Sequence, residues 1–171
     1  MFLAKLSCFP LNAARALQVK ASVMPSIESM PFFSVGYRNK ERVEVTLLSV
    51  PSDPKSQGND WVKALVQVEV GAFKGELEVY ICVSDMIRFK EQLEPVYRDL
   101  QGVAEFKTIE GQLAIRIEVD KLGHVQASGF VLDDFDSGNK LHFNISYDQT
   151  LLWHTISEID EALFELFPPT A

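Results

Sequence analysis

The side chains in this chain that could do chemistry are its histidines, its cysteines and a cluster of aspartates. The histidines are His124, His142 and His154. None stands beside a cysteine or a carboxylate at a spacing typical of metal ligands, so each is interpreted as a surface histidine. Cys8 and Cys82 allow a disulfide, but two separate thiols in a reducing compartment are the favoured interpretation.

The segment 133–139 reads DDFDSGN, which has the oxygen-rich composition of a calcium loop. A calcium loop places ligands at its first, third and fifth positions and glycine at the sixth. Counting from Asp134, Gly138 falls where the third ligand belongs and Asn139 where the glycine belongs. The pattern therefore favours a solvated hairpin loop over a calcium site.

No other motif indicates an enzyme. The glycines of segment 71–75 are not followed by the Lys-Ser/Thr pair and helix of a phosphate-binding loop. No serine, histidine and aspartate stand in a nucleophile-elbow context, and no carboxylate pair is singled out by its surroundings. The sequence thus predicts a non-enzymatic protein with no metal and no cofactor.

The charge is unevenly distributed along the chain. The net charge is −8, but residues 1–40 contain five basic residues and one acidic residue, so the remaining residues carry −12. A surface of this sign repels nucleic acid and suits a basic protein partner, although solubility alone would also explain it. The apolar runs are far shorter than the roughly 18 residues that span a bilayer, so no membrane segment is expected.

Residues 1–34 differ in composition from the rest of the chain. They are weakly basic and contain Pro10, Pro25 and Pro31. We expect residues 1–40 to form a leader that is disordered or loosely docked, and residues 41–171 to form one domain. A transit peptide, or an upstream extension preceding a true start at Met24 or Met30, would also fit this composition.

Most of the domain alternates apolar and polar residues, which is the period of a strand with one buried face. The alternation is clearest in the segment 111–150, where three runs are separated by turn residues and predict a meander of antiparallel hairpins. The expected strands are centred on residues 43–47, 61–70, 76–83, 104–109, 113–119, 125–131 and 141–147.

Two segments show the spacing of amphipathic helices instead. The first carries apolar residues from Met86 to Leu100, with Ser84 or Asp85 as cap and Gly102 as its end. Pro95 interrupts it, so either one kinked helix or two short helices are expected, and the continuous apolar stripe favours one. The second follows Asp148 as its cap and carries its stripe at Leu152, Ile156, Ile159, Leu163 and Leu166.

The element order is therefore β-β-β-α-β-β-β-β-α, which predicts an α+β domain. We expect one antiparallel sheet of about seven strands with both helices packed on one face, leaving the other face wet and polar. Trp61 and Trp153 are expected in the core. The wet face is expected to carry Glu76, Glu78, Arg116, Glu118, Gln126, Lys140, His142 and Asn144.

Residues 61–160 resemble the WapI-like immunity proteins of bacteria. The resemblance lies in Trp61, a Gly71-x-Phe73-x-Gly75 turn, a helix carrying Asp85, Phe89 and Leu93, Gly111-Gln112-Leu113, Gly123-His124-Val125, Gly138-Asn139-x-Leu141-x-Phe143 and Asp148-Gln149-Thr150. It implies a protein that acts in the bacterial cytoplasm. There it would bind the C-terminal toxin domain of a large polymorphic toxin, often a nuclease, and block it without chemistry.

Two surfaces are candidates for the partner. The first is an acidic tip made of Asp133, Asp134 and Asp136, together with Glu158 and Glu161 on the outer face of the last helix. It would suit a basic toxin domain. The second is the wet sheet face, which would matter more for a regulatory or structural interaction domain with a different partner. An enzyme of unknown class is a third hypothesis, and it has no positive support.

Overall fold

The computed structural model describes residues 30–51, 61–134, 136 and 138–168. Residues 1–29, the larger part of the expected leader, including Cys8, lie outside this description. The strands are β1 (Met30–Gly36), β2 (Arg42–Leu47), β3 (Trp61–Val70), β4 (Phe73–Cys82), β5 (Gly102–Lys107), β6 (Leu113–Val119), β7 (His124–Leu132) and β8 (Lys140–Asp148), and the helices are α1 (Val83–Asp99) and α2 (Thr150–Leu166).

The predicted α+β class and antiparallel meander are confirmed, but the strands form two sheets rather than one. Each sheet has four strands in chain order, β1-β2-β3-β4 and β5-β6-β7-β8. The helix α1 stands between β4 and β5, and these two strands do not pair. Alternation of apolar residues reports a buried face and does not identify the neighbouring strand, so it could not separate one sheet from two.

The strand β1 lies inside the segment expected to be leader. It pairs antiparallel with β2, with a register shift between Pro31 and Phe33. Because of this irregularity, both Phe32 and Phe33 are fully buried, and the alternation that marks the other strands is missing here. The folded unit therefore extends upstream of residue 41, to Met30.

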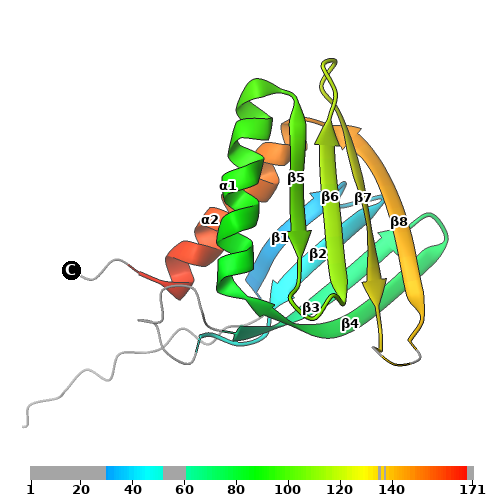
Figure 1. Cartoon of the computed structure of the whole chain (residues 1–171), viewed down its shortest axis with the longest axis vertical. Helices are drawn as coiled ribbons and strands as arrows, with labels where there is room; N and C mark the ends of the chain where they lie inside the picture. Colours follow the sequence, from blue (N-terminus) through cyan, green and yellow to red (C-terminus); the bar gives the residue numbers. More distant parts are fainter. Residues whose placement is uncertain (1–29, 52–60, 135, 137, 169–171) are drawn as a thin grey trace, which may run out of the picture.

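The two sheets enclose one core, and the helices close its open side (Figure 1). The helix α1 packs beside β5 and α2 beside β1. At the other side, β8 crosses the ends of the first sheet. A Cβ atom built on Gly36 would lie 3.2 Å from Ile145, and one built on Gly75 would lie 3.9 Å from Leu141.

An aromatic cluster joins both sheets to α1. The ring of Phe33 on β1 lies 5.5 Å from that of Phe89 on α1 and 5.3 Å from that of Phe106 on β5. The rings of Phe89 and Phe106 are 5.5 Å apart, and all three side chains are buried. The expectation that Trp61 and Trp153 would be core residues is wrong, since their exposed fractions are 42% and 55%.

The helix α1 is a single helix that runs through Pro95, as the apolar stripe predicts. Its ends differ from the prediction. It begins at Val83, so Ser84 and Asp85 lie in its first turn and no side chain caps it. Its last residue is Asp99, and the C-cap residue Leu100 adopts the left-handed conformation with φ of 50°, while Gly102 already belongs to β5. At α2 the N-cap residue is Gln149 rather than the predicted Asp148, and no side chain caps the helix. Asp148 ends β8 and accepts a hydrogen bond of 2.9 Å from the Thr150 N–H.

Candidate partner-binding surface

The loop between β7 and β8 carries the acidic tip predicted from the sequence, and Asp133, Asp134 and Asp136 are all exposed. The carboxylate of Asp133 accepts hydrogen bonds from the backbone N–H of Asn139 at 2.6 Å and from its side-chain amide at 3.1 Å. The side-chain bond from Asn139 lowers the pKa of Asp133 below its ordinary value. Asp134 accepts a bond of 3.1 Å from the Asp136 N–H. Hydrogen bonds within the loop therefore hold the carboxylates of Asp133 and Asp134 in place.

Beside the acidic tip is an apolar groove of about 390 Å³. One wall belongs to the start of β4 and the other to the end of β7 and the start of β8, so the groove lies between the two sheets. Phe73 is the most exposed apolar side chain in it, with 66% of its surface accessible. The lining residues are Phe73, Lys74, Gly75, Glu76, Leu77, Val131, Asp133, Asn139, Lys140 and Leu141.

Both ammonium groups at the groove have partners already. The Nζ atom of Lys74 lies 2.6 Å from the carboxylate of Glu69, and that of Lys140 lies 3.4 Å from the ring centre of Phe130. The carboxylate of Glu76 accepts a hydrogen bond of 2.9 Å from the neutral amide of Gln67. The groove and the acidic tip together therefore favour positive charge.

The structure does not bring the two predicted helix residues to this loop. Glu158 is only 9% exposed and bonds to Ser34 on β1, so it does not lie on the outer face of α2 as expected. Glu161 is exposed. The helix α2 starts at the end of β8 opposite to the loop and runs away from it behind α1 (Figure 1). The inner face of an amphipathic helix is normally apolar, so the sequence pattern of α2 does not predict that the carboxylate of Glu158 faces inward.

The second candidate, the wet sheet face, is divided between the two sheets. Glu76 and Glu78 belong to β4, whereas the other six residues lie on the outer face of β6, β7 and β8. On that outer face, Arg116 pairs with Glu105 at 2.6 Å and with Glu118 at 3.3 Å.

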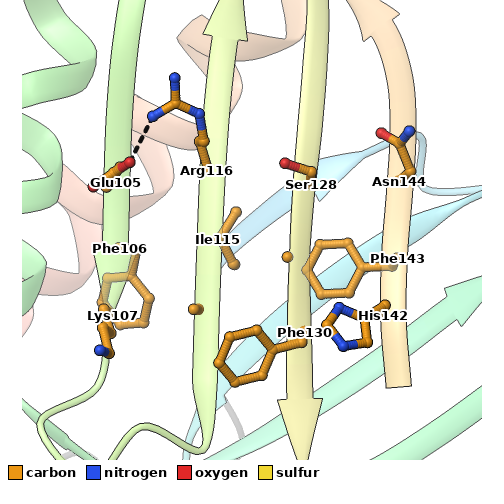
Figure 2. Close-up of a pocket in the computed structure, with 12 residues that line it drawn as sticks. Glu105, Phe106, Lys107, Ile115, Arg116, Ser128, Phe130, His142, Phe143 and Asn144 are labelled. Carbon is orange, nitrogen blue, oxygen red and sulfur yellow. Dashed lines mark hydrogen bonds and ion pairs between the residues drawn. The ribbon is translucent and has the colours of Figure 1, made fainter. Parts of the chain in front are cut away.

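The outer face of β5 to β8 contains an open hollow of about 500 Å³ (Figure 2). The short side chains of Ala114 and Ser128 are among its lining residues. Phe130 and His142 stand together on one side of it, with ring centres 5.8 Å apart. The hollow offers aromatic surface and a mixture of charges, so its lining does not carry the single sign of charge found at the acidic tip.

Two of the three histidines contact a neighbouring side chain. The imidazole of His124 lies 3.0 Å from the Asp120 carboxylate, and His142 stands beside Phe130. Within the described ranges, no group of three or more histidine, cysteine or acidic residues is arranged to hold a metal ion. Neither described helix is long and apolar enough to cross a membrane.

The apolar residues of the groove were not predicted to form a surface, although Asp133 was expected in the acidic tip and Glu76 and Lys140 on the wet sheet face. Phe73 and Gly75 form part of one motif, and Asn139 and Leu141 form part of another, more than 60 positions later in the chain. A large apolar residue directly after a tight hairpin turn was the available signal, because such a tip is commonly exposed. That the two motifs meet is a property of the tertiary fold.

The comparisons with known proteins address the whole fold. No curated protein matches the chain. A family model described as the immunity protein WapI-like family matches residues 35–168, from the end of β1 to beyond the end of α2. The match spans the acidic tip, the groove and both sheets, and it covers most of the sequence. The chain therefore belongs to the WapI-like family of immunity proteins.

Proposed function

We propose that this protein is a non-enzymatic immunity protein that binds the C-terminal toxin domain of a cognate polymorphic toxin and neutralises it by covering its working surface. The family match over residues 35–168 is the observation that carries this proposal. In the proposal the protein acts in the cytoplasm and binds protein rather than nucleic acid or membrane. The net charge of −8 supports a basic target, as expected for a toxin that is a nuclease.

Within this proposal the acidic tip makes the first contact. Asp133, Asp134 and Asp136 are exposed on one loop, and hydrogen bonds within it order the carboxylates of Asp133 and Asp134. Exposed carboxylates of this kind raise the association rate with a positively charged partner more than they raise the final affinity. Glu161 is exposed on α2 and is proposed as a peripheral contact, whereas the burial of Glu158 supports a role in holding α2.

The test is a rescue experiment with the full chain. The chain is expressed together with the C-terminal domain of the large protein encoded beside it, and bacterial growth is followed. We expect growth with the unaltered chain and loss of rescue when Asp133, Asp134 and Asp136 are changed to lysine. The matched control changes Glu91, Glu110 and Glu165, three exposed carboxylates elsewhere, to lysine, which alters the net charge by the same amount.

A second candidate function is a regulatory or structural interaction domain that uses the outer face of β5 to β8. The hollow beside Phe130 and His142 favours this alternative. Rescue that survives the aspartate changes but is lost on Phe130→Ala would keep immunity and move the interface to that hollow. Absence of both toxicity and complex formation would remove the immunity function.

A further inference from the structure

The free edges of the two sheets are not equivalent. The edge strands are β1, β4, β5 and β8. The edge of β1 is occupied by α2, since the Ser34 N–H donates to Glu158 and the Ser34 carbonyl accepts from the Thr155 hydroxyl at 2.6 Å. The helix α1 packs along β5, whereas β8, like β4, is an edge strand that pairs on one side, with β7. In the part of the chain that the structure describes, β4 pairs with β3 alone, so alternate residues of this ten-residue strand direct their N–H and C=O groups outward.

The groove defined above lies directly beside this free edge. Phe73, Gly75 and Leu77 share the inner face of β4 at its start, and they face Val131 and Leu141 across the groove. In the second half of β4 the corresponding residues, Val79 and Ile81, are buried in the core. The inner face of β4 is thus covered at one end and open at the other, and the open end presents apolar surface.

The charges around the groove select the occupant. Asp133 lines the groove, Asp134 follows it in the acidic tip, and Glu76 stands on the outer side of β4. The lining also holds two lysines, Lys74 paired with Glu69 and Lys140 over the ring of Phe130, so the excess of negative charge comes from the acidic tip and from Glu69. An approaching segment therefore meets carboxylates around an apolar floor, which favours apolar side chains flanked by lysine or arginine.

We propose that an extended segment of the toxin domain adds to the free edge of β4 as a further strand and inserts an apolar side chain into the groove between Phe73 and Leu141. This inference rests on the proposed immunity function and adds its mode of binding. Main-chain hydrogen bonds to β4 supply part of the affinity, and the groove supplies selectivity. Alternate side chains of the added strand point into the groove and outward beside Glu76, so the segment alternates apolar and basic residues.

The decisive variant is Gly75→Phe, which fills the groove with the protein's own side chain. Gly75 does not have a positive φ, and a Cβ atom there meets only Leu141, at the ordinary contact distance of 3.9 Å. The backbone at this position therefore accepts a Cβ atom, and the ring would occupy the groove of about 390 Å³. The second variant is Phe73→Ser, which removes an exposed apolar side chain. Its matched control is Leu122→Ser, at a turn residue that is 80% exposed and distant from the groove in sequence.

Binding is measured with the purified full chain and a catalytically inactive toxin domain from the same locus. We expect Gly75→Phe and Phe73→Ser to raise the Kd by roughly 30-fold or more, which is the size typical of an interface hot spot. The Kd of Leu122→Ser is expected to be unchanged. Hydrogen exchange in the complex is expected to slow at the amides of residues 74–80 in β4. Thermal unfolding of each variant, measured without toxin, verifies that the fold is kept.

The outcomes separate this inference from the proposed function. If the unaltered chain binds but both groove variants bind equally well and β4 gains no protection, strand addition is wrong and immunity stands. If the unaltered chain neither binds nor rescues, both are wrong. If the groove variants change only self-association, measured by light scattering, then a second copy of the chain occupies the edge and the inference is overturned.

Discussion

The carboxylate of Glu158 accepts two hydrogen bonds from Ser34, one of 2.7 Å from the backbone N–H and one of 2.8 Å from the hydroxyl. These bonds join α2 to β1 across 124 positions of the sequence. Arg38 adds a bond of 3.2 Å, although its side chain is 67% exposed. The carboxylate thus takes the place that a neighbouring strand would have at the edge of β1.

We expect Glu158→Ala to lower the free energy of unfolding by about 2–3 kcal/mol, because it leaves the Ser34 N–H without its acceptor at a partly buried site. Urea unfolding of the full chain measures this change. Glu161→Ala, at an exposed position on the same helix, is the control and is expected to change stability by less than about 0.5 kcal/mol. Unchanged stability of Glu158→Ala combined with lost rescue would instead place Glu158 in the interface.

The aromatic cluster of Phe33, Phe89 and Phe106 makes a second stability prediction. Phe89 is fully buried and its ring contacts both sheets, so Phe89→Ala is expected to cost about 3–5 kcal/mol. Phe164→Ala on α2 is the matched control, because that ring is 63% exposed. Chemical unfolding followed by circular dichroism distinguishes them, and equal losses for the two would contradict the role of the cluster.

The elements that the sequence predicted well are those whose apolar pattern has a single period. β6 and β8 alternate without interruption, and α1 keeps its stripe through Pro95. The strand β1 was not predicted, because the register shift between Pro31 and Phe33 lets two consecutive phenylalanines face the core. The division of the strands into two sheets was not predicted, because tertiary packing decides which strands pair and no local sequence pattern encodes it.

In the candidate site, too, some features follow from local sequence and others depend on the tertiary fold. Exposure of Asp133, Asp134 and Asp136 follows from loop composition alone, and the structure agrees. The inward position of Glu158 depends on the presence of β1, whose residues do not show the alternation that predicts a strand. The groove could not be anticipated, because Phe73 and Leu141 become neighbours only when β8 crosses the end of the first sheet.

Stability is expected to decline on acidification. The carboxylate of Asp120 accepts a hydrogen bond from the His124 side chain and further bonds from the N–H groups of His124 and Leu122, which hold its pKa below the ordinary value of 3.8. Because the folded-state pKa is the lower one, the stabilisation is complete above the unfolded-state pKa. It is lost as the pH falls through the folded-state pKa. Asp133 and Asp148 have pKa values lowered by similar hydrogen bonds.

Urea unfolding as a function of pH tests this. Between pH 6 and 5 we expect a constant midpoint, and below about pH 4 a decline that is shallower in Asp120→Asn. Lys121→Gln, in the same turn, is the control and should retain the full decline. An identical acid slope in Asp120→Asn would show that the Asp120 turn does not contribute.

Association with the toxin domain is expected to slow as salt rises, because the acidic tip attracts a basic partner over a distance that salt shortens. Raising NaCl from about 0.05 to 0.5 M is expected to lower the association rate constant roughly tenfold, with little change in dissociation. Changing Asp133, Asp134 and Asp136 to asparagine should flatten this dependence. Stopped-flow measurements test both, and a rate independent of salt would contradict electrostatic capture.

The end of α1 gives a last prediction, in which a substitution stabilises the fold. Among the described residues, Leu100 is the one non-glycine residue with positive φ, and its side chain is partly exposed. An L-residue in the left-handed region costs about 1 kcal/mol relative to glycine, and glycine is the residue preferred after a helix end. Leu100→Gly is therefore expected to raise the free energy of unfolding by roughly 0.5 kcal/mol or more. Leu122→Gly, at an exposed turn residue of ordinary φ, should lower it, and a loss of stability in both would mean that the contacts of the Leu100 side chain outweigh its backbone strain.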